Sequence, residues 1–176
     1  MGAETLMRRA TAPVAALLAV LALALMIVAG RERPATGHVP QIGQPAPRLV
    51  AQQLSDGATF DSSSLAGQSW MLNVWASWCE PCLQEHQYLM MLAAEDIIIV
   101  GLAYQDDPVE TQKWLDKLGN PYAAVGIDER GQIAAAWQVP GVPMSFLIDA
   151  DGNISRRFTG AIDSPAKVRS ILAWLR

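Results

Sequence analysis

The two cysteines constrain the fold of this chain more than any other feature. They are the only cysteines in 176 residues, and both lie in Trp78-Cys79-Glu80-Pro81-Cys82. Just before them, Trp70 to Trp75 (WMLNVW) is apolar almost throughout, which is typical of a central strand buried on both faces. Just after them, Leu83 to Ala94 has the pattern of a helix. The sequence therefore predicts a cysteine pair that follows a buried strand and opens a helix.

That position favours thiol chemistry. A thiol at a helix N-terminus lies near unpaired backbone N–H groups and the positive end of the helix dipole, and both stabilise the thiolate. Pro81 is compatible with a first helical turn, because its missing N–H would have no partner there. The first cysteine of such a pair is expected to be exposed, with the second tucked beneath it. We therefore predict that Cys79 is the nucleophile and Cys82 the resolving thiol of a redox disulfide.

Other uses of a cysteine pair fit less well. A haem-attachment site needs histidine directly after the second cysteine, where this chain has Leu83. A structural zinc site needs four ligands, and only His38 and His86 could join the cysteines. An inert structural disulfide remains an alternative, but so short a loop contributes little stability. The pattern favours redox chemistry, with no metal and no cofactor.

The rest of the chain alternates between strand and helix patterns. The expected strands are a hairpin over 49–60, then 97–103, 123–127, and a second hairpin formed by 144–148 and 154–158. The expected helices are 109–118, 133–137 and 165–175. This order predicts an α/β fold in which a central mixed sheet is flanked by helices on both faces.

A second feature lies close to the later hairpin. Gly141-Val142-Pro143 precedes the strand over 144–148, and a proline just before a strand can hold a cis peptide bond. A cis Val142–Pro143 bond would leave the backbone of Val142 free to pair with an extended substrate beside the cysteines. Val142 and Pro143 are therefore predicted substrate-binding residues, and Trp78 is expected to cover the disulfide and contact substrate. Pro140 is the alternative position for the cis bond.

Glu85 is the candidate base. It lies three residues after Cys82 on the same helix face, so it can approach the thiol pair. If Glu85 is buried, its pKa would rise and its carboxylate could take the proton of the resolving thiol. The alternative is a solvated glutamate that interacts favourably with the helix dipole. The next residue, His86, is expected to be a solvated helix residue.

The N-terminus predicts a membrane anchor. Pro13 to Ala29 contains no charge and follows Arg8 and Arg9. Such a helix would reach roughly 26 Å, near the short limit for a membrane span. We expect residues 1–30 to be an uncleaved anchor rather than a cleaved signal, with the N-terminus in the cytoplasm. Residues 31–47, with four prolines, are the expected extended tether, and residues 48–176 the expected domain.

Charge argues against nucleic acid as a partner. Lys plus Arg total 13 and Asp plus Glu total 17, for a formal net charge of −4. No more than two basic residues are consecutive, so the sequence offers no basic patch for a phosphate backbone.

Several segments resemble a known family. The strand and cysteine pair, with Pro143 before a later strand, resemble the thioredoxin superfamily over about residues 40–176. The more specific matches are to the cytochrome c biogenesis thiol:disulfide interchange proteins (CcmG/DsbE). These matching segments are Leu72–Cys79 (LNVWASWC), Glu85-His86, Gly101–Asp107 (GLAYQDD) and Leu118–Tyr122 (LGNPY). The resemblance implies a thioredoxin-like fold with an N-terminal hairpin and a central insertion, and Asn73 in place of the buried acid of cytoplasmic thioredoxins.

The resemblance also implies a function. These proteins are inner-membrane, periplasm-facing oxidoreductases that reduce the haem-site disulfide of apocytochrome c. Their partners are other cytochrome c maturation components and a transmembrane thiol donor of the CcdA/DsbD type. One departure is Met144-Ser145, where the family commonly has an acidic residue directly after the cis proline. This leaves open a general periplasmic reductase of the TlpA or ResA type, and a module that only holds unfolded apocytochrome.

Overall fold

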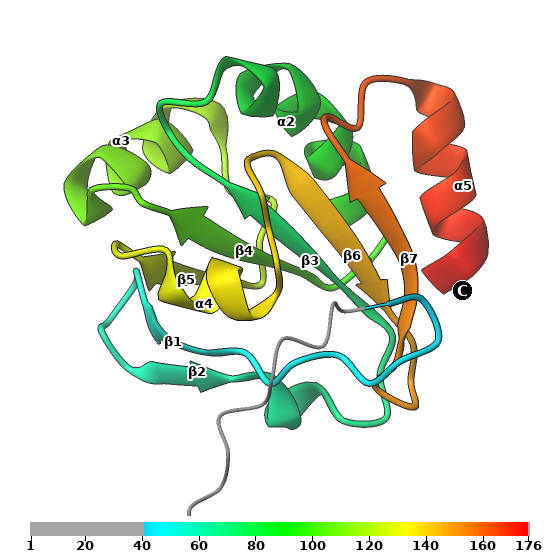
Figure 1. The fold of residues 1–176 in the computed structure, drawn as a ribbon. Helices are drawn as coiled ribbons and strands as arrows, with labels where there is room; N and C mark the ends of the chain where they lie inside the picture. Colours follow the sequence, from blue (N-terminus) through cyan, green and yellow to red (C-terminus); the bar gives the residue numbers. More distant parts are fainter. Residues whose placement is uncertain (1–40, 176) are drawn as a thin grey trace, which may run out of the picture. The chain divides into compact units, whose positions relative to one another are not determined.

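The computed structural model describes residues 41–175, which form a seven-stranded sheet in the order β2-β1-β5-β4-β3-β6-β7. The strands are β1 (Val50–Gln53), β2 (Thr59–Asp61), β3 (Trp70–Trp75), β4 (Ile99–Tyr104), β5 (Ala124–Asp128), β6 (Met144–Ile148) and β7 (Ile154–Thr159). The helices are the short 3₁₀ helix η1 (Ser62–Leu65), α2 (Glu80–Ala93), α3 (Pro108–Leu118), α4 (Gln132–Ala136) and α5 (Pro165–Leu175). Figure 1 shows their arrangement.

The sheet is mixed, as predicted. Strand β3 is parallel to β4 and antiparallel to β6, and its register places Asn73 beside Gly101 on one side and Ser145 on the other. All six residues of β3 are buried, because apolar layers cover both faces of the sheet. Beyond β4, the sheet is extended by β5 and then by the β1–β2 hairpin. The expected N-terminal hairpin, β1 with β2, and strand β5 therefore lie on the same side of β4.

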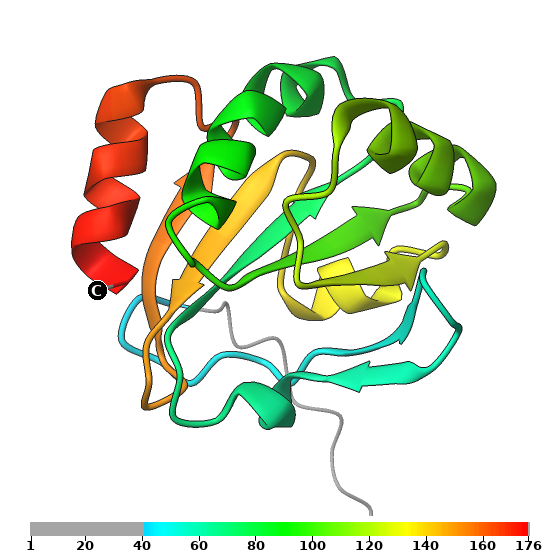
Figure 2. The same cartoon turned by 180° about the vertical axis from the view of Figure 1, so that it is seen from behind.

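Helices cover both faces, which confirms the predicted layers. Helices α2 and α3 connect the parallel neighbours β3, β4 and β5 in the same direction, so right-handed crossovers place both on one face. Helix α5 packs beside α2 on this face, and α4 lies on the opposite face (Figures 1 and 2). Leu89, Leu115 and Ile171 belong to the core under α2, α3 and α5, whereas Trp137 and Phe146 belong to the core under α4.

Two differences from the expected elements are local. Helix α2 begins at Glu80, earlier than the predicted start at Leu83, because Cys79 caps it and Pro81 fits its first turn. Helix η1 was not predicted; it begins where the Asp61 carboxylate accepts the N–H of Ser63. Asp61 also pairs with Arg48 across the hairpin.

The predicted anchor lies outside the described residues, as does the tether up to residue 40. Among residues 41–175, no helix is both long enough and apolar enough to cross a membrane. The final part of the predicted tether is held against the domain. The Gly43 N–H donates to the Ile154 carbonyl at 2.7 Å, and the Ala46 N–H donates to the Gly152 carbonyl at 2.9 Å.

Candidate active site

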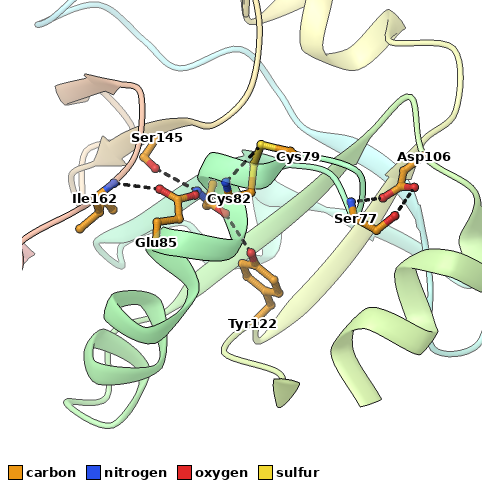
Figure 3. Close-up of a disulfide and its surroundings, with 9 residues drawn as sticks. Ser77, Cys79, Cys82, Glu85, Asp106, Tyr122, Ser145 and Ile162 are labelled. Atoms are coloured by element: carbon orange, nitrogen blue, oxygen red, sulfur yellow. Dashed lines mark hydrogen bonds between the residues drawn. A yellow bond between two sulfur atoms is a disulfide. The ribbon is translucent and has the colours of Figure 1, made fainter. Parts of the chain in front are cut away.

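The structure forms the predicted disulfide. Cys79 and Cys82 are joined at the N-terminus of α2 with an S–S distance of 2.05 Å (Figure 3). The Sγ atom of Cys79 also accepts the backbone N–H of Cys82 at 3.2 Å. This contact shows that the sulfur occupies the capping position of the helix, where a negative charge on Cys79 would be stabilised by backbone donors.

The exposure of the pair corrects one expectation. Cys79 is only 5% exposed and Cys82 is 1% exposed, so the predicted open position of Cys79 is wrong. The reason is packing, since both sulfur-bearing side chains belong to the apolar core under α2. Cys79 is still the more accessible of the two, and this order agrees with its predicted role as the attacking thiol.

Glu85 is fully buried and hydrogen-bonded, and so is not the solvated glutamate of the alternative interpretation. One carboxylate oxygen accepts from Asn73 Nδ2 at 2.9 Å, and the other accepts from the Ile162 N–H at 2.9 Å (Figure 3). Asn73 also donates to the Ser145 hydroxyl at 3.1 Å and accepts from the Tyr122 hydroxyl at 2.9 Å. Side chains of β3, β6, α2 and the segment before β5 therefore meet in a single polar network within the core.

Burial controls the electrostatics of this network. It raises the pKa of Glu85 from 4.5 to about 7, although the N–H of Ile162, the amide of Asn73 and the charge of Lys167 each favour the ionised form. Burial, followed by the nearby charge of Glu85, also raises the pKa of Tyr122 well above its usual 10.0. Tyr122 thus remains a hydroxyl donor to Asn73, while Glu85 can exchange a proton near neutral pH.

His86 differs from the prediction of a solvated residue. It is only 5% exposed, its Nε2 lies 3.2 Å from the Leu118 carbonyl oxygen, and its ring lies edge-on to Trp114 with centroids 4.5 Å apart. Burial lowers the pKa of His86 despite that hydrogen bond. The residue helps to pack α2 against α3. Trp75, on β3, is a core residue stacked on Tyr122 with centroids 5.4 Å apart.

The structure also places the predicted substrate-binding residues. The Val142–Pro143 peptide bond is cis, as expected, and Val142 packs against the core that contains both cysteines. Between residues 41 and 175 the backbone of Val142 makes no hydrogen bond. Trp78 is 60% exposed, and its indole Nε1 donates to the Gln105 carbonyl at 3.1 Å.

Comparison with known proteins decides the family. The Redoxin family model matches residues 41–174. The thiol:disulfide interchange protein DsbE of Yersinia pestis is 39% identical over 160 residues, covering 89% of this chain and 85% of that protein. DsbE of Escherichia coli K12 is 37% identical over 155 residues and covers 84% of each chain. The chain belongs to the DsbE family of the thioredoxin superfamily.

A solved structure agrees with the DsbE assignment. A secreted Mycobacterium tuberculosis disulfide oxidoreductase, described as homologous to Escherichia coli DsbE, is 30% identical and has a TM-score of 0.65. The match covers 72% of this chain and 96% of that one. With a cysteine pair at the head of α2, this DsbE-family chain is a thiol:disulfide oxidoreductase of the periplasmic type.

Three residues of this DsbE-family site were not assigned roles from the sequence. They are Ser145 and Tyr122, which contact Asn73, and Asp106, whose carboxylate contacts Ser77. Ser145 could have been found from strand register, since a polar residue in the buried strand β6 needs a polar neighbour. Tyr122 and Asp106 lie in the segments LGNPY and GLAYQDD, where family resemblance is the only sequence signal.

Proposed function

We propose that this chain is a disulfide reductase whose substrate is the haem-site disulfide of apocytochrome c during cytochrome c maturation. The observation that carries the thiol chemistry is the Cys79–Cys82 pair at the head of α2, with the buried carboxylate of Glu85 one helical turn beyond Cys82 and its pKa raised to about 7. A base with that pKa suits the removal of a thiol proton near neutral pH. The named relatives, which are thiol:disulfide interchange proteins, support the same chemistry.

The reaction uses the two cysteines in turn. In the reduced protein the Cys79 thiolate attacks one sulfur of the substrate disulfide, forms a mixed disulfide and releases one substrate thiolate. Cys82 then loses its proton and attacks the Cys79 sulfur. This second step releases the other substrate sulfur as a thiolate and leaves the Cys79–Cys82 disulfide. The protein dithiol loses two electrons to the substrate, and the two substrate thiolates take their protons from solvent.

Glu85 receives the proton of Cys82 in the second step. Its two carboxylate oxygens already accept from Asn73 and Ile162, which fixes the orientation of the group. Because the site is buried, the neutral and ionised forms of the carboxyl differ little in free energy at neutral pH. The glutamate can therefore accept the proton and lose it again when the protein is next reduced.

An unfolded substrate would dock beside the disulfide on apolar side chains and free backbone. Trp78 is 60% exposed and Leu83 is 44% exposed, and they flank the cysteine pair in the chain. The unpaired backbone of Val142, next to Pro143, would hydrogen-bond to an extended segment of the substrate. These contacts suit apocytochrome c, whose haem-binding segment is unfolded before haem is attached.

The location and electron supply follow from the direction of the reaction. A reductase in an oxidising compartment must receive electrons from across the membrane. We propose that residues 1–30 anchor the chain in the inner membrane by a single span, that residues 31–47 tether the domain, and that residues 48–176 act in the periplasm. The electron donor would then be a transmembrane thiol protein of the CcdA/DsbD type.

Trapping tests the substrate. In the full-length Cys82→Ala variant the mixed disulfide on Cys79 cannot be resolved, so partners stay attached and can be identified. We expect c-type apocytochromes, and no trapped partner in a matched variant that also carries Cys79→Ala. Buried Met144, 2% exposed directly after Pro143, favours a second candidate, a general periplasmic reductase, and trapping of varied disulfide proteins would support it. Failure of the reduced wild type to pass electrons to a disulfide-bearing peptide would refute both.

A further inference from the structure

A buried carboxylate joins the loop before the cysteines to the loop after β4. Asp106 is 6% exposed and accepts three hydrogen bonds. Its Oδ2 accepts the Ser77 N–H at 2.6 Å, and its Oδ1 accepts the Ser77 hydroxyl at 2.8 Å (Figure 3). Oδ1 also accepts the N–H of Asp107, the residue that caps α3. Asp106 therefore connects the start of α3 with a residue two positions before Cys79.

A second contact joins the same two loops. The indole Nε1 of Trp78 donates to the Gln105 carbonyl at 3.1 Å. Gln105 has a φ of +47°, which is uncommon for a residue with a side chain, and its N–H is held by the Asp128 carbonyl at 2.9 Å. Two consecutive residues before the nucleophile are thus fixed to two consecutive residues after β4.

We propose that Asp106 is a positioning residue for the thiol chemistry, which holds the Ser77–Trp78 segment and through it keeps the Cys79 sulfur at the N-terminus of α2. This inference rests on the proposed function, since it concerns the same cysteine. Asp106 does not touch the disulfide in any contact of the described residues. It acts on the Cys79 sulfur only through the backbone that leads to it.

The position requires a carboxylate rather than an amide. All three partners of Asp106 can donate, and two of them are backbone N–H groups that can only donate. These two N–H groups bind different oxygens. An asparagine has only one acceptor oxygen. In either orientation of the amide, its NH₂ group therefore faces one of these two backbone N–H groups. Asp106→Asn therefore leaves one of the two part-buried N–H groups facing an NH₂ group, which weakens the link between the two loops although the side chain keeps its size.

The variant separates two roles for Asp106. If the aspartate acted only through its negative charge, removing that charge would favour the Cys79 thiolate, and alkylation would move to lower pH. If it acts by position, the sulfur moves away from the helix N-terminus, the thiolate loses its backbone donors, and alkylation moves to higher pH. The two roles thus predict shifts of opposite sign.

The test uses reduced full-length protein and iodoacetamide across a range of pH, with mass spectrometry to measure alkylation at Cys79. For Asp106→Asn we expect the half-maximal pH to rise on the order of one unit, which is about a tenfold loss of thiolate at pH values below the half-maximal point of the wild type. The rate of reduction of a disulfide-bearing peptide should fall on the order of tenfold. An unchanged or lowered half-maximal pH overturns the proposal.

Matched variants separate an effect on the position of Cys79 from a general loss of stability. Asp61 lies on the edge strand β2, where its carboxylate accepts the Ser63 N–H and pairs with Arg48. Asp61→Asn should leave the alkylation profile in place, and an equal shift there would contradict the proposal. If Asp106→Asn does not fold, Ser77→Ala is the second variant. It should move the profile in the same direction, whereas Ser77→Thr, which keeps the hydroxyl, should restore it.

The two proposals fail separately. Alkylation needs no protein substrate, so the profile tests Asp106 even if the wild type reduces no peptide. A wild type that reduces the peptide, combined with an unshifted Asp106→Asn profile, would leave the reductase function standing and refute the positioning role alone.

Discussion

Replacing Glu85 by glutamine tests the electrostatics of the site directly. The substitution keeps the size of the side chain and removes its titration. Glutamine can also be accommodated. If the Asn73 amide turns over, its oxygen accepts the new NH₂ group and the Ser145 hydroxyl, and its NH₂ group donates to the Tyr122 oxygen. We therefore expect Glu85→Gln to fold, which makes its pH dependence interpretable.

The magnitude follows from the raised pKa. The pKa of Glu85 is 4.5 in an ordinary setting and about 7 in the folded protein. Between these values the folded state binds more protons than the unfolded state, so the free energy of unfolding falls as pH rises and levels off above about pH 7. From about pH 5 to about pH 8, the loss attributable to Glu85 is roughly 2 to 3 kcal/mol.

The measurement is urea unfolding of the oxidised protein at a series of pH values. The free energy of unfolding of the wild type should fall by roughly 2 to 3 kcal/mol between about pH 5 and about pH 8, and that of Glu85→Gln should fall much less. The variant should therefore be the more stable protein at alkaline pH. Glu80→Gln is the matched control, because it removes the same charge from an exposed position in the first turn of the same helix. Its pH dependence should follow that of wild type. Parallel curves for wild type and Glu85→Gln would refute the assignment of the raised pKa to Glu85.

Two further substitutions probe the surroundings of the network. Tyr122→Phe removes the hydroxyl that donates to Asn73 Oδ1, so we expect a loss of about 1 to 3 kcal/mol in urea unfolding, and no loss would show that water replaces the hydroxyl. Gly101→Ala would place its Cβ 2.9 Å from Trp75 Nε1 and 2.9 Å from the Tyr122 ring, and overpacking of this kind typically lowers stability by about 1 to 3 kcal/mol. Gly141→Ala is its control, since nothing lies within 4 Å and thermal unfolding should be nearly unchanged.

The fold was predictable from the sequence because its elements carry strong local patterns. Strand β3 was predicted at its observed limits, since its residues are apolar almost throughout. Strand β6 and helix α5 also have their predicted limits. The start of α2 was missed because its first turn contains the cysteine pair and a proline rather than an apolar repeat. Cys79 caps this helix with a sulfur, and no sequence rule for helix starts includes that residue type.

The site was only partly predictable, because its decisive contacts join residues far apart in the chain. Spacing along one helix identified Glu85 as a neighbour of Cys82, but could not choose between a buried base and a solvated residue. The choice depends on Asn73, on β3, and on Ile162, which lies 77 residues away in the sequence. The same limit explains the error over His86, whose burial depends on its contacts with Leu118 and Trp114.

Asn73 explains how a single acid can serve this site. A second carboxylate on β3 would face the Glu85 oxygen now 2.9 Å from the Asn73 amide, and two like charges that close cannot both ionise near neutral pH. An amide avoids the conflict because one side chain both donates and accepts. Asn73 donates to Glu85 and Ser145 while it accepts from Tyr122, so both ends of its amide have partners. The strand therefore orients the carboxylate that the helix supplies. In the mechanism we propose, this division of roles places the base on the same helix as Cys82, the thiol whose proton it would take.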